Sequence, residues 1–192
     1  MESRPRIILL FSGKRKSGKD YFTNELLKFP ALENKIEVLK ISQPIKSYWA
    51  IEKNLNLKEL LSDSEYKEQY RQEMIKWSDE MRAQDYGYFC RAACDNAQVK
   101  QIWMVSDIRR KTDIKWFKEK YGDLVKTIRI LADEETRMRR GYRFRDGVDN
   151  VASECDLDDY LQWDLVIDNS EGSNIDKQIS DVYNLISGFM ID

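Results

Sequence analysis

The chain has 192 residues, enough for one well-buried core but short for two independent domains, so we expect a single domain spanning 1–192. Its composition, 42% hydrophobic and 34% charged, is ordinary for a globular protein, and no apolar run approaches the roughly 20 residues of a membrane-spanning helix. The net charge of −2 gives no general attraction to nucleic acid or anionic membranes, and the absence of histidine removes the commonest general base.

The first half of the chain alternates strand and helix patterns. The polar N-terminus has no small-residue cleavage site of the signal-peptide type and leads into an apolar run, which predicts a buried strand in an intracellular protein. A later stretch repeats apolar side chains every three or four residues, which is typical of an amphipathic helix. The predicted elements are strands at 6–12 and 36–41 and helices at 19–28, from Ser42 and Pro44, at 64–82 and at 88–97.

The second half continues the alternation. It predicts strands at 101–106, 124–131 and 165–167, and helices at 112–120, at 133–140 and after the last strand. Strands that alternate with helices imply an α/β fold with a parallel sheet flanked by helices on both faces. The charged stretch 141–163 fits neither period, and a long insertion of this kind commonly serves as a mobile lid.

The most specific motif follows the first predicted strand. The sequence GKRKSGKD at 13–20 matches the Walker A pattern through its lysine, Lys19. Because this loop follows an apolar strand and opens a helix, its backbone N–H groups can converge on the β-phosphate of ATP, with Lys19 reaching the β- and γ-phosphates. The loop residues expected to bind ATP are Gly13, Lys14, Arg15, Lys16, Ser17, Gly18, Lys19 and Asp20.

Asp20 stands where the usual motif has Ser or Thr, whose hydroxyl binds Mg²⁺. A carboxylate is a hard, charged oxygen ligand that can hold the ion directly or through water, with Ser17 as a second contributor. The alternative for Asp20 is a plain acid in the first turn of a helix, favoured there by the helix dipole. We therefore expect Mg²⁺ as cofactor, with Asp20 and Ser17 as its candidate ligands.

Motifs along nearly the whole chain match one kinase family in order. They include the phosphate loop with its Lys-Arg-Lys and terminal Asp, Tyr66-Lys67-Glu68, Phe89-Cys90-Arg91, Val105-Ser106-Asp107, Arg109-Arg110, Gly147-Val148-Asp149 and Ser153-Glu154-Cys155. On these residues, from about Arg6 to Asn169, the chain resembles the animal-type phosphomevalonate kinases. One departure is the lid sequence Arg143-Phe144-Arg145-Asp146, which is more basic than expected for the family.

The resemblance implies a fold like that of nucleoside monophosphate kinases, with acceptor-binding helices at about 43–97 and a lid at about 141–163. It implies an enzyme that transfers the γ-phosphoryl group of ATP to (R)-5-phosphomevalonate, giving (R)-5-diphosphomevalonate and ADP in the mevalonate pathway of isoprenoid and sterol biosynthesis. We expect these two substrates as the only partners, and a monomer. We expect a cytosolic location, because the C-terminus Phe189-Met190-Ile191-Asp192 has no Ser-Lys-Leu-like peroxisomal address.

The basic clusters are assigned to the two phosphorylated substrates, whose charges guanidinium groups neutralise well. Asp107, Arg109 and Arg110 follow a predicted strand at its carboxyl end, where ligands bind in open α/β sheets. We assign the two arginines to the acceptor phosphate and the transferring phosphoryl group, and Asp107 to Mg²⁺-bound water or the acceptor oxygen. The alternative is a solvated loop of paired charges. The candidate catalytic residues are Lys14, Lys19, Asp107, Arg109 and Arg110.

Further candidates lie on other elements. The resemblance places Arg82 over the acceptor, Arg140 on ATP and Asn169 on a ligand, and we count Asn169 with the substrate-binding residues. Arg137 lies three residues before Arg140 on the same helix face, so we expect it to bind ATP as well. Lys46, after Pro44, is a candidate for acceptor binding, with an ordinary surface lysine as the alternative.

Other functions are also compatible with parts of the sequence. A P-loop kinase for another phosphorylated acceptor, such as a nucleoside monophosphate, differs only in its acceptor site. A nucleotide-dependent switch is disfavoured because no Asp-x-x-Gly occurs, and Asn34-Lys35-Ile36-Glu37 falls too early for a guanine-reading motif. A nucleic-acid-binding module is disfavoured by the near-neutral charge and the lack of aromatics interleaved with the basic clusters.

The cysteines and tryptophans are predicted to be structural. Cys90 and Cys94 lie one helical turn apart, a spacing that suits a metal pair, but without histidine or a second cysteine pair it favours packing of reduced thiols. The third cysteine, Cys155, has no partner in this pattern. The tryptophans assigned to the core are Trp49, Trp77, Trp103, Trp116 and Trp163.

Overall fold

A parallel sheet forms the centre of the computed structural model, which describes residues 4–62 and 65–190. Its strands are β1 (Ile7–Gly13), β2 (Ile36–Leu39), β3 (Ile102–Val105), β4 (Val125–Leu131) and β5 (Leu165–Asp168). Within the described residues the order is β2-β3-β1-β4-β5, with every neighbouring pair parallel. This arrangement confirms the predicted α/β fold class with a parallel sheet.

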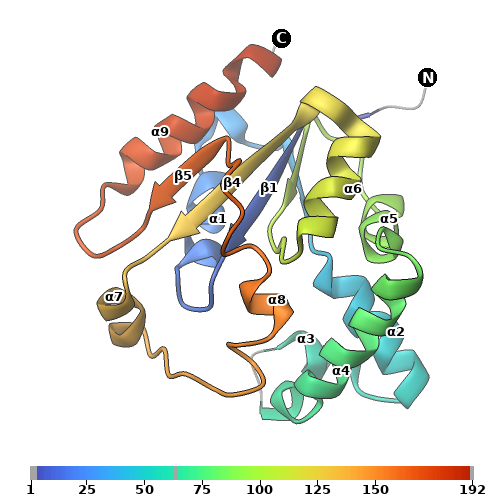
Figure 1. Cartoon of the computed structure of the whole chain (residues 1–192). Helices are drawn as coiled ribbons and strands as arrows, with labels where there is room; N and C mark the ends of the chain where they lie inside the picture. Colours follow the sequence, from blue (N-terminus) through green and yellow to red (C-terminus); the bar gives the residue numbers. More distant parts are fainter. Residues whose placement is uncertain (1–3, 63–64, 191–192) are drawn as a thin grey trace.

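Helices connect the strands and extend past one end of the sheet (Figure 1). They are α1 (Lys19–Leu27), α2 (Ser42–Lys53), α3 (Leu57–Leu61), α4 (Glu65–Gln84), α5 (Tyr88–Asp95), α6 (Lys111–Tyr121), α7 (Glu134–Arg139), α8 (Ala152–Cys155) and α9 (Ile175–Ile186). Short 3₁₀ turns lie at Pro30–Leu32, Gly122–Leu124 and Ser187–Phe189. Across the described residues, none of the helices combines the length and apolar character needed to cross a membrane.

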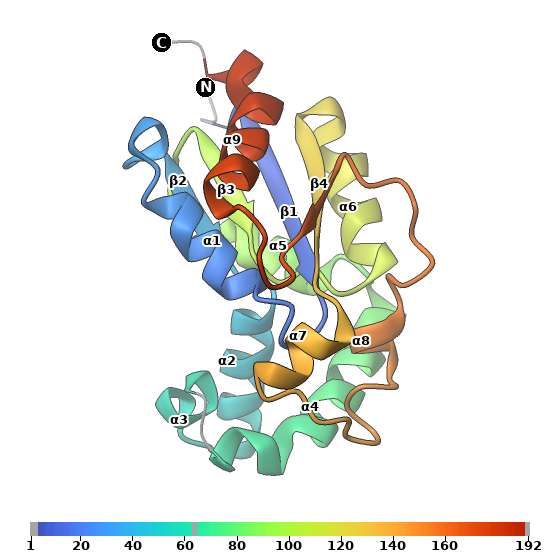
Figure 2. The ribbon, with the colours of Figure 1, turned by 90° about the vertical axis from the view of Figure 1, so that its left-hand side faces the viewer.

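The central strand β1 is buried on both faces. Ile7, Leu9 and Phe11 pack with side chains of α1 and α9, whereas Ile8 and Leu10 pack with α5 and α6 on the opposite face (Figure 2). Successive side chains of a strand point to opposite faces, so burial on both sides requires the continuous apolar run seen in the sequence. Truncating one of these side chains, as in Leu9→Ala, would cost about 2–5 kcal/mol. The loop that follows β1 therefore starts from a rigid base.

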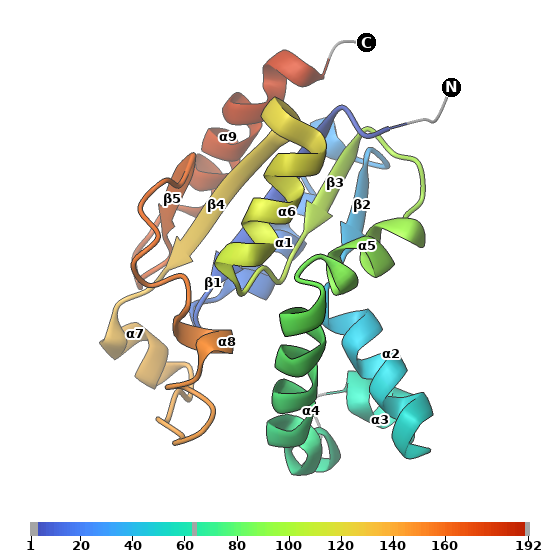
Figure 3. The same cartoon turned by 45° about the vertical axis from the view of Figure 1, so that its right-hand side comes forward.

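A smaller apolar cluster holds α2, α3 and α4 together beyond the carboxyl ends of the strands (Figure 3). The ring centroids of Trp49 and Trp77 lie 5.7 Å apart, and Trp77 also lies 5.7 Å from Phe89 of α5. Phe89 belongs to the sheet cluster, so these rings connect the two parts. The other buried members of the small cluster are Ala50, Leu60 and Met74.

Some boundaries differ from the predicted ones. Strand β2 ends at Leu39 instead of 41 because the N–H of Ile41 donates to the carboxylate of Asp107 (2.7 Å) and not to a neighbouring strand. The helix predicted at 64–82 is α4, whose predicted first residue, Ser64, lies outside the described residues, as do Met1 to Ser3 and the C-terminal Ile191 and Asp192. The short helix α3 was not predicted, and the stretch 141–163 contains one helical turn, α8.

The cysteine pair and the tryptophans pack as predicted. Cys90 and Cys94 are buried in the cluster between the sheet, α5 and α6, and burial raises the pKa of the Cys94 thiol to about 11, which makes it unreactive at neutral pH. Trp49, Trp103 and Trp116 are buried, and Trp77 and Trp163 are partly buried against the same clusters. These positions confirm the core assignment.

Candidate active site

The phosphate loop lies at the carboxyl edge of the sheet, between β1 and α1. Gly18 has a φ of +83°, and a Cβ there would lie 2.2 Å from Nδ2 of Asn169. A Cβ on Gly13 would lie 2.6 Å from Oγ of Ser17. The two glycines of the motif are therefore required by close approach, and at Gly18 also by backbone conformation. Lys16, at φ +66°, is exposed at the tip of the loop.

Three side chains from distant parts of the chain fix the backbone of this loop. Asn169 donates to the carbonyl of Ser17 (2.9 Å), and Arg140 donates to the same carbonyl (3.1 Å) and to that of Asn169 (2.8 Å). Arg137 donates to the carbonyl of Arg15 (3.0 Å). The structure thus brings the three residues that were assigned to ATP or substrate against the loop, at its α7 and β5 side.

Lys19 and Asp20 lie together at the start of α1. Their charged groups are 2.5 Å apart, and the Asp20 side chain is largely exposed. Desolvation alone would raise the pKa of the Asp20 carboxyl, but the charge and hydrogen bond of Lys19 outweigh it, so that this pKa lies below its usual range. Asp20 is therefore ionised at neutral pH, as a ligand of a hard cation must be.

A cavity of about 350 Å³ opens between the phosphate loop, α2, α4, α8 and the β3–α6 loop. Because the strands are parallel, their carboxyl ends and the loops that follow them meet at this edge of the sheet. The cavity brings together seven of the predicted site residues: Lys19, Asp20, Lys46, Arg82, Asp107, Arg109 and Arg110. The remaining candidates lie around the phosphate loop, and Lys14, Ser17 and Arg137 line a second cavity of about 330 Å³.

Asp107 ties the sheet to the acceptor-side helices. Its two carboxylate oxygens accept the backbone N–H groups of Ile41 (2.7 Å) and Ser42 (2.9 Å), where β2 passes into α2. The first N–H groups of a helix have no partner within the helix, so a carboxylate here stabilises the start of α2. Asp107 also lines the cavity of about 350 Å³, as do Lys19 and Asp20.

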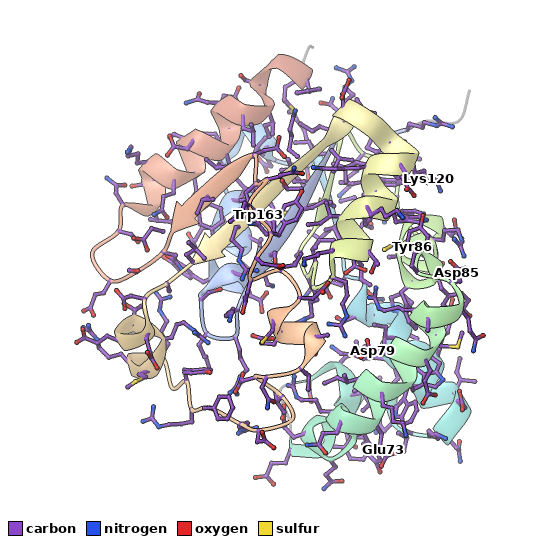
Figure 4. All side chains as sticks on the ribbon, in the orientation of Figure 1. Glu73, Asp79, Asp85, Tyr86, Lys120 and Trp163 are labelled. Atoms are coloured by element: carbon purple, nitrogen blue, oxygen red, sulfur yellow. The ribbon has the colours of Figure 1, made fainter. Side chains whose placement is uncertain are left out.

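Each arginine of the β3–α6 loop pairs with a carboxylate. Arg109 contacts Glu154 (2.6 Å) and Arg110 contacts Asp79 (2.5 Å), which lies on α4 (Figure 4). Arg110 is only 8% exposed, and its second terminal nitrogen is buried with no hydrogen-bond partner in the described part of the chain. An unpartnered guanidinium nitrogen in a buried side chain is costly. Arg110 also lines the cavity of about 350 Å³.

Comparisons with known proteins agree with this geometry. A family model described as phosphomevalonate kinase matches residues 11–123. A phosphomevalonate kinase from Drosophila melanogaster is 49% identical over 180 residues, covering 91% of this chain and 93% of that protein. This chain belongs to the phosphomevalonate kinase family.

A solved structure shares the fold of this family member at low sequence identity. TT1252 from Thermus thermophilus superposes with a TM-score of 0.56 and 14% identity, covering 98% of this chain and all of that one. Shikimate kinase from Aquifex aeolicus has a TM-score of 0.46 and 12% identity, covering 95% of this chain and 97% of that one.

The phosphate loop and Arg109 also contact acidic residues that were not predicted to belong to the site. Lys14 pairs with Asp158 (2.6 Å) and Arg15 with Asp149 (2.6 Å), while Glu154 accepts from the backbone N–H of Arg15 as well as from Arg109. All three acids lie in the segment 141–163 predicted as a lid, and Asp149 and Glu154 occur in motifs that carry the family resemblance. That resemblance was the available signal, but it did not indicate which cation each acid contacts.

The donors near the phosphate loop fit a Mg²⁺ ion. The described residues contain no cluster of three acidic or thiol side chains that could enclose a metal. Mg²⁺ in kinases needs no such cluster, because it commonly takes one or two carboxylates together with substrate phosphates and water. Asp20 and Asp107 face the same cavity, whereas Ser17, whose buried hydroxyl has no partner in the described residues, lines the other.

Proposed function

We propose that this chain transfers the γ-phosphoryl group of ATP to (R)-5-phosphomevalonate, giving (R)-5-diphosphomevalonate and ADP in the mevalonate pathway. Membership of the phosphomevalonate kinase family supports the reaction. The single observation that carries the site is Arg110, which is buried at a cavity rich in cations and has a guanidinium nitrogen without a partner in the described residues.

The charge of the cavity suits two polyanionic substrates. Seven basic side chains line it against three acidic ones. Arg82 of α4, Lys46 of α2, and Arg109 and Arg110 of the β3–α6 loop line it and would hold the acceptor phosphate, because forked guanidinium groups match phosphate geometry. Lys19 lies at its phosphate-loop side, where the γ-phosphoryl group of ATP would sit.

The reaction needs positioning more than proton transfer. The attacking group is a phosphate oxygen of the acceptor, and a phosphate monoester with a second pKa of about 6 is already ionised at neutral pH. No general base is required, in agreement with a chain that has no histidine. Lys19 and Arg109 would neutralise the charge that develops on the transferring group and the leaving β-phosphate.

Mg²⁺ would be held by Asp20, with Asp107 in reach of its water shell, and when bound it neutralises charge on the ATP phosphates. The backbone N–H groups of the loop 13–18 would hold the β-phosphate, and Arg137 and Arg140 would lie along the ATP as well as along the loop. Asn169 keeps the loop in shape beside them. Ser17, the other candidate for the metal, lines the second cavity, whereas Asp20 lines the first.

The segment 141–163 is the proposed lid. It contacts the phosphate loop through Asp149 and Glu154, and its Arg145 contacts Glu68 of α4 (3.1 Å). Carboxylates that pair with the loop cations occupy positions where phosphates would bind, so the arrival of ATP would exchange these contacts. The expected monomeric state and cytosolic location stay predictions, which sedimentation and cell fractionation would test.

An assay of ADP release with matched acceptors tests the proposed function. We expect ADP release with ATP and mevalonate 5-phosphate, and none above background with unphosphorylated mevalonate, which lacks the phosphate that the arginines bind. Nucleoside monophosphates serve as the competing acceptors. Faster turnover with a nucleoside monophosphate would overturn the proposed acceptor while leaving the kinase fold and the phosphate loop in place.

A further inference from the structure

Asp113 is a buried carboxylate that contacts three arginines lining the cavity of about 350 Å³. It lies in the first turn of α6, only 1% exposed, and does not line the cavity itself. Its two oxygens accept from four donors. One oxygen contacts a terminal nitrogen of Arg82 and the thiol of Cys90 (3.7 Å), and the other accepts the backbone N–H groups of Arg109 (3.2 Å) and Arg110 (3.1 Å).

These contacts join three cationic residues from two separate elements. Arg82 comes from the end of α4, whereas Arg109 and Arg110 come from the loop between β3 and α6. We infer that Asp113 is a positioning residue for acceptor binding: it fixes Arg82 and the backbone of Arg109 and Arg110 in one arrangement around the acceptor phosphate without touching the substrate. This inference rests on the proposed assignment of these three arginines to the acceptor.

The negative charge of Asp113 is needed for Arg82 in particular. The Arg82 side chain is 11% exposed, and burial alone would lower its pKa, but the charge and hydrogen bond of Asp113 outweigh this and raise the pKa instead. Arg82 also packs its guanidinium over the ring of Phe89, 5.5 Å from the centroid. Arg82 is charged in any case, and the carboxylate balances this buried charge and holds the guanidinium in one direction, so the anion site is formed before the substrate arrives.

If Asp113 only stabilised the start of helix α6, its negative charge would not be needed. The N–H groups of Arg109 and Arg110 need only an oxygen acceptor, and an asparagine oxygen can serve. The ion pair with Arg82 needs a charge. Asp113→Asn therefore separates the two roles, because it keeps an acceptor of the same shape for the loop and removes the charge that faces Arg82.

The test compares KM values for the two substrates in Asp113→Asn. We expect the KM for mevalonate 5-phosphate to rise by about tenfold or more, as misplacement of a positioning group does, while the KM for ATP changes by less than about twofold. Ile114→Val is the matched control: Ile114 is the next residue of α6, 2% exposed, and its substitution lowers Tm through packing alone. The control should leave both KM values unchanged.

A double-mutant cycle with Arg82→Met shows whether Asp113 acts through Arg82. If it does, Asp113→Asn raises the KM for mevalonate 5-phosphate far less in the Arg82→Met background than in the wild type. If the KM fold-changes of the two single variants simply multiply in the double variant, the inference is overturned. Equal rises in the KM values for both substrates in Asp113→Asn alone would also overturn it. An unchanged KM in Arg82→Met would instead overturn the proposed assignment of Arg82.

A second variant covers the case in which Asp113→Asn does not fold. Asp113→Glu keeps the negative charge but displaces the carboxylate by one methylene, so Arg82 stays paired and moves. We expect Asp113→Glu to raise the KM for mevalonate 5-phosphate with little change for ATP. A wild-type KM for the acceptor in this variant would count against positioning by Asp113.

Discussion

The side chain of Lys19 stands at the junction of the phosphate loop and the acceptor cavity, 2.5 Å from Asp20. A cation at this position interacts more strongly as the bridging oxygen and β-phosphate gain charge in the transition state. We expect Lys19→Met to lower kcat by about 100-fold or more with Tm nearly unchanged. Lys28→Met, at the exposed far end of α1, is the control and should keep full activity. Near-normal turnover in Lys19→Met would remove the phosphate-loop assignment.

Arg110 tests acceptor recognition at a single side chain. Its buried guanidinium is oriented by Asp79 and lines the cavity. Arg110→Ala should raise the KM for mevalonate 5-phosphate by about tenfold or more and leave the KM for ATP within about twofold. Arg91→Ala, which removes a half-exposed arginine of α5 outside the cavity, is the matched control. Equal rises in both KM values would show that Arg110 is wrongly placed.

Variants of Asp20 test whether its carboxylate is a metal ligand or only an acidic residue that stabilises the start of α1. If its carboxylate holds Mg²⁺, Asp20→Asn should raise the half-saturating Mg²⁺ concentration, and Asp20→Ser should retain more activity than Asp20→Ala because a hydroxyl can ligate the ion. If Asp20 only complements the helix dipole, the variants lose about 0.3–1 kcal/mol of stability and keep the wild-type metal dependence. Mg²⁺ titration at fixed ATP, with thermal melts alongside, decides between the two.

At the scale of residues, the basic residues of the site could be predicted from the sequence, but the acidic residues that contact them could not. The phosphate loop and the Arg109-Arg110 pair follow strand ends, and that position alone predicts that they meet at the edge of a parallel sheet. The acids Asp113 and Glu154 have no such local signal. Glu154 reaches Arg15 across 139 positions of the chain, and neither helical nor strand periodicity carries information about a contact of that range.

At the scale of elements, the contact between the lid segment and the phosphate loop depends on pH. Asp149, with its side chain 2% exposed, accepts from Arg15 and from the N–H of Arg145 (2.8 Å). Desolvation would raise the pKa of its carboxyl, but Arg15 and the backbone hydrogen bond lower it below the usual range. A depressed folded-state pKa contributes stability above the unfolded value of about 4, and that stability is lost as pH falls through the folded value.

Asp149→Asn should therefore destabilise the protein by about 1–3 kcal/mol at pH 7, and the difference from wild type should shrink as pH falls below about 4. Asp159→Asn is the control, since Asp159 pairs with Lys111 at the surface and is 74% exposed, where an ion pair contributes little. Thermal melts of the three proteins between pH 7 and pH 3 measure the effect. A constant gap between Asp149→Asn and wild type across this range would show that the charge of Asp149 does not stabilise the lid contact.

Strands and helices could be predicted where one or both of their faces are buried along their whole length. Strand β1 is buried on both faces and shows a continuous apolar run. Helix α4 is buried on one face and shows apolar side chains every three or four residues. Helix α3 was missed although Asn56, whose side chain accepts the N–H groups of Lys58 and Glu59, is a recognisable cap. The turn α8 has no apolar stripe. Its Glu154 accepts a hydrogen bond from the backbone N–H of Arg15 and forms an ion pair with Arg109, and no periodicity of the sequence indicates either contact.

At the scale of the whole molecule, a net charge of −2 conceals a local excess of positive charge at the cavity. The cations gather there because α1, α2, α4 and the β3–α6 loop all present residues to one edge of the sheet. Their like charges repel, and the acids Asp79, Asp113 and Glu154 offset that repulsion in the folded chain. Phosphate-bearing ligands offset it further, so binding and stability are linked.

Packing between the two parts of the molecule, together with ligand binding, predicts how the protein melts. The rings of Trp49 and Trp77 connect the α2–α4 cluster to the sheet, so we expect one cooperative transition that coincides by tryptophan fluorescence and by far-UV circular dichroism. A substrate at about 100 times its Kd stabilises the folded state by about 2.7 kcal/mol, which is a rise in Tm of about 5–10 °C for a domain of this size. Mevalonate 5-phosphate should produce this rise, and mevalonate at the same concentration should not. Two separate transitions, or a ligand shift seen by one probe alone, would show that the acceptor-side helices unfold independently of the sheet.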